Sequence, residues 1–204
     1  MEGFEQMEEN FKKHITIDDL SFISEKYSFQ SKTNGANVWH SEQGDGLGIF
    51  FFNLKPDLPK DITNLDLLEK FYQEQLLKVN GKVVEVDHVE LDSCKAIKLI
   101  IKLPQDPSGL TYLISFTLPY KDFSFVIKAQ CEEYGMTGIK EALLVDRYLG
   151  KGGKIEDLQK INFDSLEYDT EFPEHPIERA RKIGKDIIEK IKVSDKIKAS
   201  TPFN

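Results

Sequence analysis

The stretch that decides the fold is KAIKLIIKLPQDPSGLTYLISFTLPYKDFSFVIKAQC, residues 95–131. Apolar residues recur there at every second position in three successive runs, Ile97 to Leu103, Leu110 to Leu118 and Phe123 to Cys131. A period of two turns side chains alternately to the two faces of a sheet. The pattern therefore predicts three antiparallel strands with one continuously apolar, packed face and an opposite face that is mostly polar and partly solvated.

Signals on both sides of this meander predict an α+β fold. Asn34-Gly35 supplies the tight turn of an early hairpin. Thr63 and Asp66 resemble a capping box that opens an amphipathic helix, and a change of apolar phase at Asp87-His88 indicates a bulge in the strand over 82–91. The expected order is three strands, a helix, four strands and two helices, a largely antiparallel sheet of about seven strands in an α/β/α sandwich.

Two helices are expected after the meander. The second begins at Pro176 and ends near Lys192, and its arginines and lysines are expected to form the one basic surface of an acidic protein. The first covers residues 137–149, and its buried stripe is expected to be Ile139, Ala142, Leu143 and Leu149.

Length and charge exclude several classes of protein. With 204 residues, the chain fits a single domain with its core over 27–192, while 1–14 and 193–204 are expected to be peripheral. A net charge of −8 argues against a dedicated nucleic-acid binder. The sequence has neither a secretory signal nor an apolar run of about 20 residues, which favours a cytoplasmic protein that does not interact with membranes. The Lys and Ile usage is typical of a bacterium.

No catalytic or metal-binding motif is apparent. The four histidines and the two cysteines, Cys94 and Cys131, lack metal-ligand spacing, so neither a zinc site nor another cofactor is expected. The cysteines are expected to lie too far apart for a disulfide, and Cys131 is interpreted as a small buried hydrophobe. The glycines at 44–48 and 150–153 fit turns and a helix end better than a phosphate-binding loop.

Two groups of residues are candidates for a binding site. Glu132, Glu133 and Tyr134 follow the last strand of the meander, and the loops after strands often carry sites. Trp39 and His40 are the other pair, although a core tryptophan and a half-exposed strand histidine explain them as well. His175, just before Pro176, is interpreted as a helix-start residue.

The order of elements from Tyr27 to Lys192 resembles the Mog1/PsbP-like α/β/α sandwich group. The resemblance rests on topology, including the Phe50-Phe51-Phe52 strand and the meander ending in Ala129-Gln130-Cys131. It implies a non-enzymatic, partner-binding or accessory protein, and it carries over no site residue.

Three hypotheses of function follow. The first is a non-catalytic protein that binds another protein. The second is a small-molecule binder, or an enzyme, whose site is assembled from distant segments near Trp39 and Glu132-Glu133-Tyr134. The third is that the basic last helix docks on an acidic partner or an anionic surface.

Overall fold

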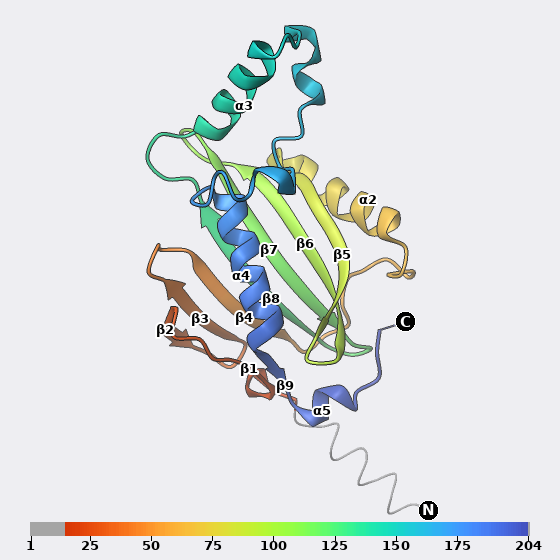
Figure 1. The fold of residues 1–204 in the computed structure, drawn as a ribbon. Coiled ribbons are helices and arrows are strands. Elements are labelled where there is room, and N and C mark those ends of the chain that lie inside the picture. Colours follow the sequence, from red (N-terminus) through yellow and green to blue (C-terminus); the bar gives the residue numbers. More distant parts are fainter. Residues whose placement is uncertain (1–14, 204) are drawn as a thin grey trace, which may run out of the picture.

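The chain folds into a seven-stranded antiparallel sheet with helices on both faces, as seen in a computed structural model that describes residues 15–203 (Figure 1). The strand order is β2-β3-β4-β8-β7-β6-β5, and a separate two-stranded sheet pairs β1 with β9. The predicted α+β sandwich is confirmed. The strands are β1 (Leu20–Phe22), β2 (Tyr27–Lys32), β3 (Ala36–Ser41), β4 (Gly46–Phe52), β5 (Lys82–Leu91), β6 (Cys94–Pro104), β7 (Leu110–Pro119), β8 (Ser124–Glu132) and β9 (Ile191–Val193). The α-helices are α2 (Leu65–Leu76), α3 (Ile139–Gly150), α4 (Pro176–Lys190) and α5 (Asp195–Lys198), and short 3₁₀ helices are η1 (Ile17–Asp19), η2 (Leu77–Val79), η3 (Ile155–Lys160) and η4 (Leu166–Tyr168).

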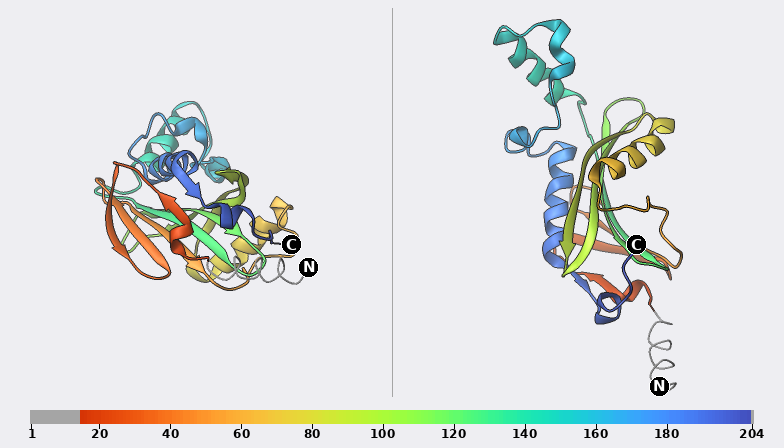
Figure 2. Two further views of the ribbon diagram at one scale, coloured as in Figure 1. Left: turned by 90° about the horizontal axis from the view of Figure 1, so that it is seen from below. Right: turned by 90° about the vertical axis from the view of Figure 1, so that its right-hand side faces the viewer.

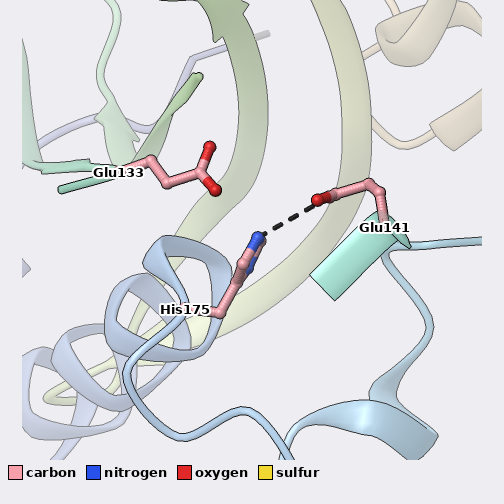
Figure 3. Close-up of side chains that lie close together, drawn as sticks. All are labelled: Glu133, Glu141 and His175. Atoms are coloured by element: carbon pink, nitrogen blue, oxygen red, sulfur yellow. Dashed lines mark ion pairs between the residues drawn. The ribbon is translucent and has the colours of Figure 1, made fainter. Parts of the chain in front are cut away.

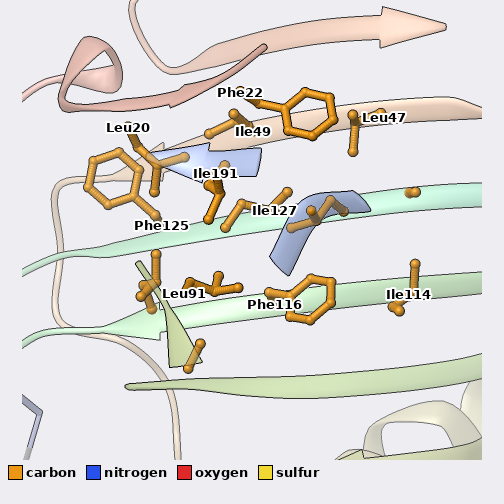
Figure 4. Close-up of a cluster of buried hydrophobic side chains, with 14 of the residues drawn as sticks. Leu20, Phe22, Leu47, Ile49, Leu91, Ile114, Phe116, Phe125, Ile127 and Ile191 are labelled. Atoms are coloured by element: carbon orange, nitrogen blue, oxygen red, sulfur yellow. The ribbon is translucent and has the colours of Figure 1, made fainter. Parts of the chain in front are cut away.

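Helices α4 and α2 cover opposite faces of the sheet (Figure 2). The main core lies under α4, where fully buried side chains of β4, β7 and β8 meet the helix and the β1-β9 pair (Figure 4). Gly184 of α4 allows a close approach to β7, because a Cβ at this position would lie 2.4 Å from Cδ1 of Ile114. Among the described residues, no helix is both long and apolar enough to cross a membrane.

The prediction of one continuously apolar sheet face is wrong for β6. Ile100 pairs with Ile114 and Ile97 pairs with Thr117, so the run Ile97 to Leu103 faces away from α4. Lys98 therefore lies on the α4 side, opposite Phe116. The reason is that β6 is buried on both faces, since Ile97 and Ile100 point to opposite sides and both are buried, so alternation alone could not assign its faces.

Two local predictions are also corrected. The bulge in β5 falls between Val83 and Glu85 rather than at Asp87-His88, and it places Glu85 opposite Ile100 on the α4 side. The cap of α2 is Asn64, whose side chain accepts a hydrogen bond from the Leu67 amide at 3.1 Å. The predicted cap, Thr63, instead hydrogen-bonds the carboxylate of Asp61.

Residues 1–14, predicted to be peripheral, lie outside the described residues, whereas Ile197 and Phe203 near the other end are buried. Cys94 and Cys131 are free and buried. Burial raises the pKa of the Cys131 thiol, and the neighbouring Asp45 carboxylate adds to this, which fits the expected role of Cys131 as a small hydrophobe.

Candidate functional site

A pocket of about 480 Å³ opens at the end of the sheet where β8 stops. Its walls come from the loop after β8, the first turn of α3 and the segment that leads into α4. Segments distant in the sequence therefore meet around one hollow. Apolar and charged side chains both line it, among them Glu133, Tyr134, Ile139, Lys140, His175 and Arg179.

Arg179, a buried residue of α4, fixes one wall. Its Nε lies 3.1 Å from Oδ2 of Asp45 and its Nη2 lies 3.1 Å from Oδ1, while Nη1 and Nη2 also donate to the backbone carbonyls of Glu174 and Glu132. The ring of Tyr134 packs over the guanidinium, 5.3 Å from its carbon atom. Because its nitrogens already have protein partners, Arg179 holds the wall together rather than offering a free cation to a ligand.

The prediction that the arginines of the last helix contribute to a basic surface is wrong for both of them. Like Arg179, Arg181 is buried, and it forms ion pairs with Glu85 and Asp169. Glu85 also accepts from Lys98 at 2.7 Å. Burial raises the pKa of Glu85, but the hydrogen bonds and charges of these two cations outweigh it and hold the pKa below its usual range. Both arginines of α4 therefore form ion pairs inside the protein.

The Glu133 carboxylate holds two loops beside the pocket through hydrogen bonds to their backbone amides. Its Oε1 accepts from the Gly138 amide at 2.7 Å and its Oε2 accepts from the Leu110 amide at 3.0 Å. Gly109 must be glycine here: its φ of +101° is left-handed, and a Cβ would lie 3.1 Å from Oε2 of Glu133 and 2.8 Å from Thr137. The carboxylate, only 8% exposed, therefore has a structural role, and each oxygen keeps a second lone pair.

His175 caps α4 and points its ring towards two carboxylates (Figure 3). Its Nδ1 accepts from the Ile177 amide at 3.4 Å, and its Nε2 lies 3.7 Å from Oε1 of Glu141, too far for a good hydrogen bond. Nε2 of His175 and Oε2 of Glu141 are buried and have no hydrogen-bond partner among the described residues. The pair therefore carries unsatisfied polar atoms in a place where desolvation is costly.

Lys140 lies next to this pair and is only 2% exposed. Burial lowers the pKa of its ammonium group, and the nearby carboxylates of Asp164, Glu141 and Asp169 offset this effect in part. Its Nζ lies 5.9 Å from the centre of the Phe172 ring. A buried lysine, a buried histidine, the buried carboxylate of Glu133 and the half-buried carboxylate of Glu141 thus share the base of α3.

The structure brings together two of the five residues proposed from the sequence. Glu133 and Tyr134 line the pocket. Glu132 is next to the pocket, where its backbone carbonyl accepts a hydrogen bond from Arg179. Trp39 and His40 lie elsewhere: Trp39 packs edge-on against other aromatic rings, and His40 is exposed on the next position of β3, which faces the other side of the sheet. A binding role for these five stays a prediction.

Sequence reasoning missed Asp45, Lys140 and Glu141, and it saw His175 only as a helix start. Lys140 and Glu141 carry no spacing signal, since their partners lie on other elements. The charge of Asp45, in a Gly-Asp-Gly turn, matters only because Arg179 reaches it from far along the chain.

An exposed apolar face runs along α3, which projects beyond the end of the sheet (Figures 1 and 2). Met136 is 78% exposed, Ile139 45%, Leu143 49% and Leu149 37%. The prediction that the stripe Ile139, Ala142, Leu143 and Leu149 is buried is therefore wrong, and the buried residues of α3 are Lys140 and Leu144. Because α3 stands off the sheet, it buries only the side that carries Lys140 and Leu144.

No protein-family model matches the sequence, and no curated protein matches it. Among solved structures, the chain is similar to the cyanobacterial PsbP of Synechocystis sp. PCC 6803, with 7% identity and a TM-score of 0.46 over 86% of this chain and 87% of that one. It is also similar to LpqN of Mycobacterium tuberculosis, a protein involved in cell envelope biogenesis, with 8% identity and a TM-score of 0.39 over 86% and 83% of the two chains.

A third similar structure, of a protein from Bacteroides thetaiotaomicron, has 6% identity and a TM-score of 0.36; the match covers 60% of this chain but only 41% of that protein's length. The similar structures thus include a PsbP, in line with the topological resemblance expected from the sequence. At these identities and TM-scores the likeness concerns the fold alone.

Proposed function

We propose that this protein is a non-catalytic binding protein that docks another protein on the apolar face of α3. The observation that carries the proposal is the exposure of Ile139 and Leu143, which are four residues apart on α3, and of Met136 in the turn before the helix. Contiguous exposed apolar side chains with a polar surround are typical of protein interaction sites. A helix that presents apolar residues one turn apart on one face is a common form of such a site.

The charge around this face defines the partner. Residues 132–175 carry eleven acidic and five basic side chains, a net charge of −6. Asp164 and Asp169 are neutralised by Lys102 and Arg181 outside this segment, which leaves a charge of −4. Complementary charge speeds association and selects partners. The partner segment is therefore basic as well as apolar, and a second copy of this acidic chain is disfavoured.

Two synthetic amphipathic helices test the proposal, one built from Leu and Lys and the other from Leu and Glu. Fluorescence anisotropy of the labelled peptides measures their binding to the full chain at increasing salt concentration. We expect the basic helix to bind, its affinity to fall as salt rises, and the acidic helix to bind far more weakly. Replacing Leu143, which is 49% exposed, by serine should weaken binding about tenfold.

The matched control is Ile23→Ser, since Ile23 is 82% exposed and lies away from α3. Equal loss of affinity in both variants, or equal binding of both peptides, would overturn the proposal. A second copy of this chain could also occupy the face, and analytical ultracentrifugation of the free chain tests this alternative. A dimer that Leu143→Ser dissociates would show that the face is a contact between copies of this chain and would overturn the proposal.

The second candidate function is binding of a small molecule, and the pocket beside Glu133 and Tyr134 favours it. Native mass spectrometry of protein purified gently from its own cells distinguishes the two functions. A small extra mass that persists through desalting supports a ligand, whereas a co-purifying protein supports a partner only if Leu143→Ser removes it and Ile23→Ser does not.

A further inference from the structure

Glu133, Glu141 and His175 converge at the base of α3 (Figure 3). One ligand atom from each lies within 4.8 Å of the others. The three residues come from three elements: Glu133 follows β8, Glu141 is in the first turn of α3, and His175 caps α4. Their convergence depends on the fold and not on any spacing in the sequence.

Two observations indicate that this cluster lacks a component. Nε2 of His175 and Oε2 of Glu141 are buried without partners, and the His175 side chain is only 6% exposed. In addition, neither Glu133 nor Glu141 has a lysine or arginine within ion-pair distance among the described residues, although Lys140 lies nearby. Buried polar atoms normally have a hydrogen-bond partner or coordinate a metal, and the two orphaned atoms have neither.

We propose that Glu133, Glu141 and His175 bind a first-row divalent metal ion, with Zn²⁺ as the ion of choice. One imidazole and two carboxylates suit such ions, whereas Mg²⁺ and Ca²⁺ prefer ligand sets made of oxygen alone. Metal–ligand bonds of about 2.1 Å span ligands up to about 4.2 Å apart, so the cluster contracts by roughly half an ångström on binding. The ion supplies the partner that both orphaned atoms lack.

Metal binding has a structural consequence at the start of α4. The Ile177 amide donates to Nδ1 of His175, which places the proton of the neutral ring on Nε2. Coordination through Nε2 moves that proton to Nδ1, so the 3.4 Å contact with Ile177 must open. This contact is long and weak, and the first turn of α4 loses only one cap bond. The Ile177 amide should therefore exchange hydrogen faster in the metal-bound protein.

The inference goes beyond the proposed function and is independent of it. The metal would join the end of β8, α3 and α4, and so fix the orientation of the projecting helix. Peptide binding at Leu143 and metal binding at the base of α3 are measured separately, so one proposal can be overturned while the other holds.

Calorimetric titration of Zn²⁺ into chelator-treated full chain tests the proposal. We expect binding of one ion per chain, weakened at least about tenfold by Glu141→Gln and by His175→Asn. Asparagine at 175 keeps a side-chain oxygen for the helix cap, so this variant removes the ligand and preserves the cap. His40→Asn is the control, since His40 is exposed and outside the cluster.

Two spectroscopic measurements complete the test. Co²⁺ in the site should give visible absorption bands that His175→Asn removes, and hydrogen exchange at Ile177 should rise on Zn²⁺ addition. Thermal melts of the metal-free variants check that each is folded. Zn²⁺ binding no tighter than about 100 μM, or binding that neither Glu141→Gln nor His175→Asn weakens, would overturn the proposal and leave a bridging water as the component that satisfies these atoms.

Discussion

Replacing Gly184 by alanine sets two effects of opposite sign against each other. Gly184 lies inside α4, where alanine is favoured over glycine by about 1 kcal/mol of helix propensity. The helix packs so closely on β7, however, that the new methyl group would lie 2.4 Å from Cδ1 of Ile114 and 3.5 Å from Cζ of Phe116. Both of these core residues are fully buried, so neither can move into solvent.

The steric clash with Ile114 should outweigh the gain in helix propensity. Carbon atoms in contact normally lie about 3.5–4.0 Å apart, so Ile114 must give way by roughly 1 Å. Overpacking of this kind costs about 1–3 kcal/mol, and subtracting the propensity gain leaves Gly184→Ala destabilised by about 1 kcal/mol. Ile114→Val alone should cost about 0.5–1.5 kcal/mol, since it removes Cδ1 and leaves a cavity. In the double variant the alanine methyl occupies that cavity, so the two costs should not add.

Urea unfolding followed by the fluorescence of Trp39, the sole tryptophan, measures these free energies of unfolding. We expect a coupling energy of at least about 1 kcal/mol in the double-mutant cycle, in the direction that favours the double variant. A more stable Gly184→Ala variant, or a cycle additive within about 0.5 kcal/mol, would refute the close packing of α4 on β7.

Two further predictions concern buried charges. Asp45→Asn should lower the free energy of unfolding by about 3–5 kcal/mol, because it leaves the buried Arg179 guanidinium without its counter-ion. The exposed pair Lys154–Glu156 is the control, and Glu156→Gln should change the free energy of unfolding by no more than about 0.5 kcal/mol in the same urea titration. The pKa of Glu85 is lowered in the folded protein, so its contribution to stability is present above the unfolded-state pKa and is lost as pH falls through the acidic range. Urea midpoints from pH 7 down to pH 3 should therefore fall more steeply for the wild type than for Glu85→Gln, and parallel curves would contradict the assignment.

The sequence was sufficient to predict which elements form, but not every face they bury. Alternation identified β7 and β8 correctly, because one phase of each is fully apolar. In β6 the phase that faces α4 is the one with Lys98 and Lys102, because Glu85 and Asp164 pair with these lysines there. The bulge at Val84 that sets the register of β5 has no local signal. The α3 stripe shows the opposite error: an amphipathic pattern indicates that a face will be covered, but not whether the same chain covers it.

The candidate site was less predictable because its chemistry depends on partners far along the chain. Glu133 and Tyr134 could be proposed because the end of a strand is visible in the sequence. Arg179 was assigned to the surface, since no local pattern indicates that Asp45 lies in the interior and faces it. For the same reason, Glu141 and His175 drew no attention as a pair.

The pairing of β1 with β9 affects how the chain can fold during its synthesis. Leu20 lies opposite Val193 and Phe22 opposite Ile191, so the partner of β1 is made about 170 residues later. At about 5–20 residues per second, β1 waits roughly 10–30 s on the ribosome without its partner strand. Throughout that time the apolar side chains of β1 lack the strand that buries them, and the small sheet can close only after Ile191–Val193 has been made.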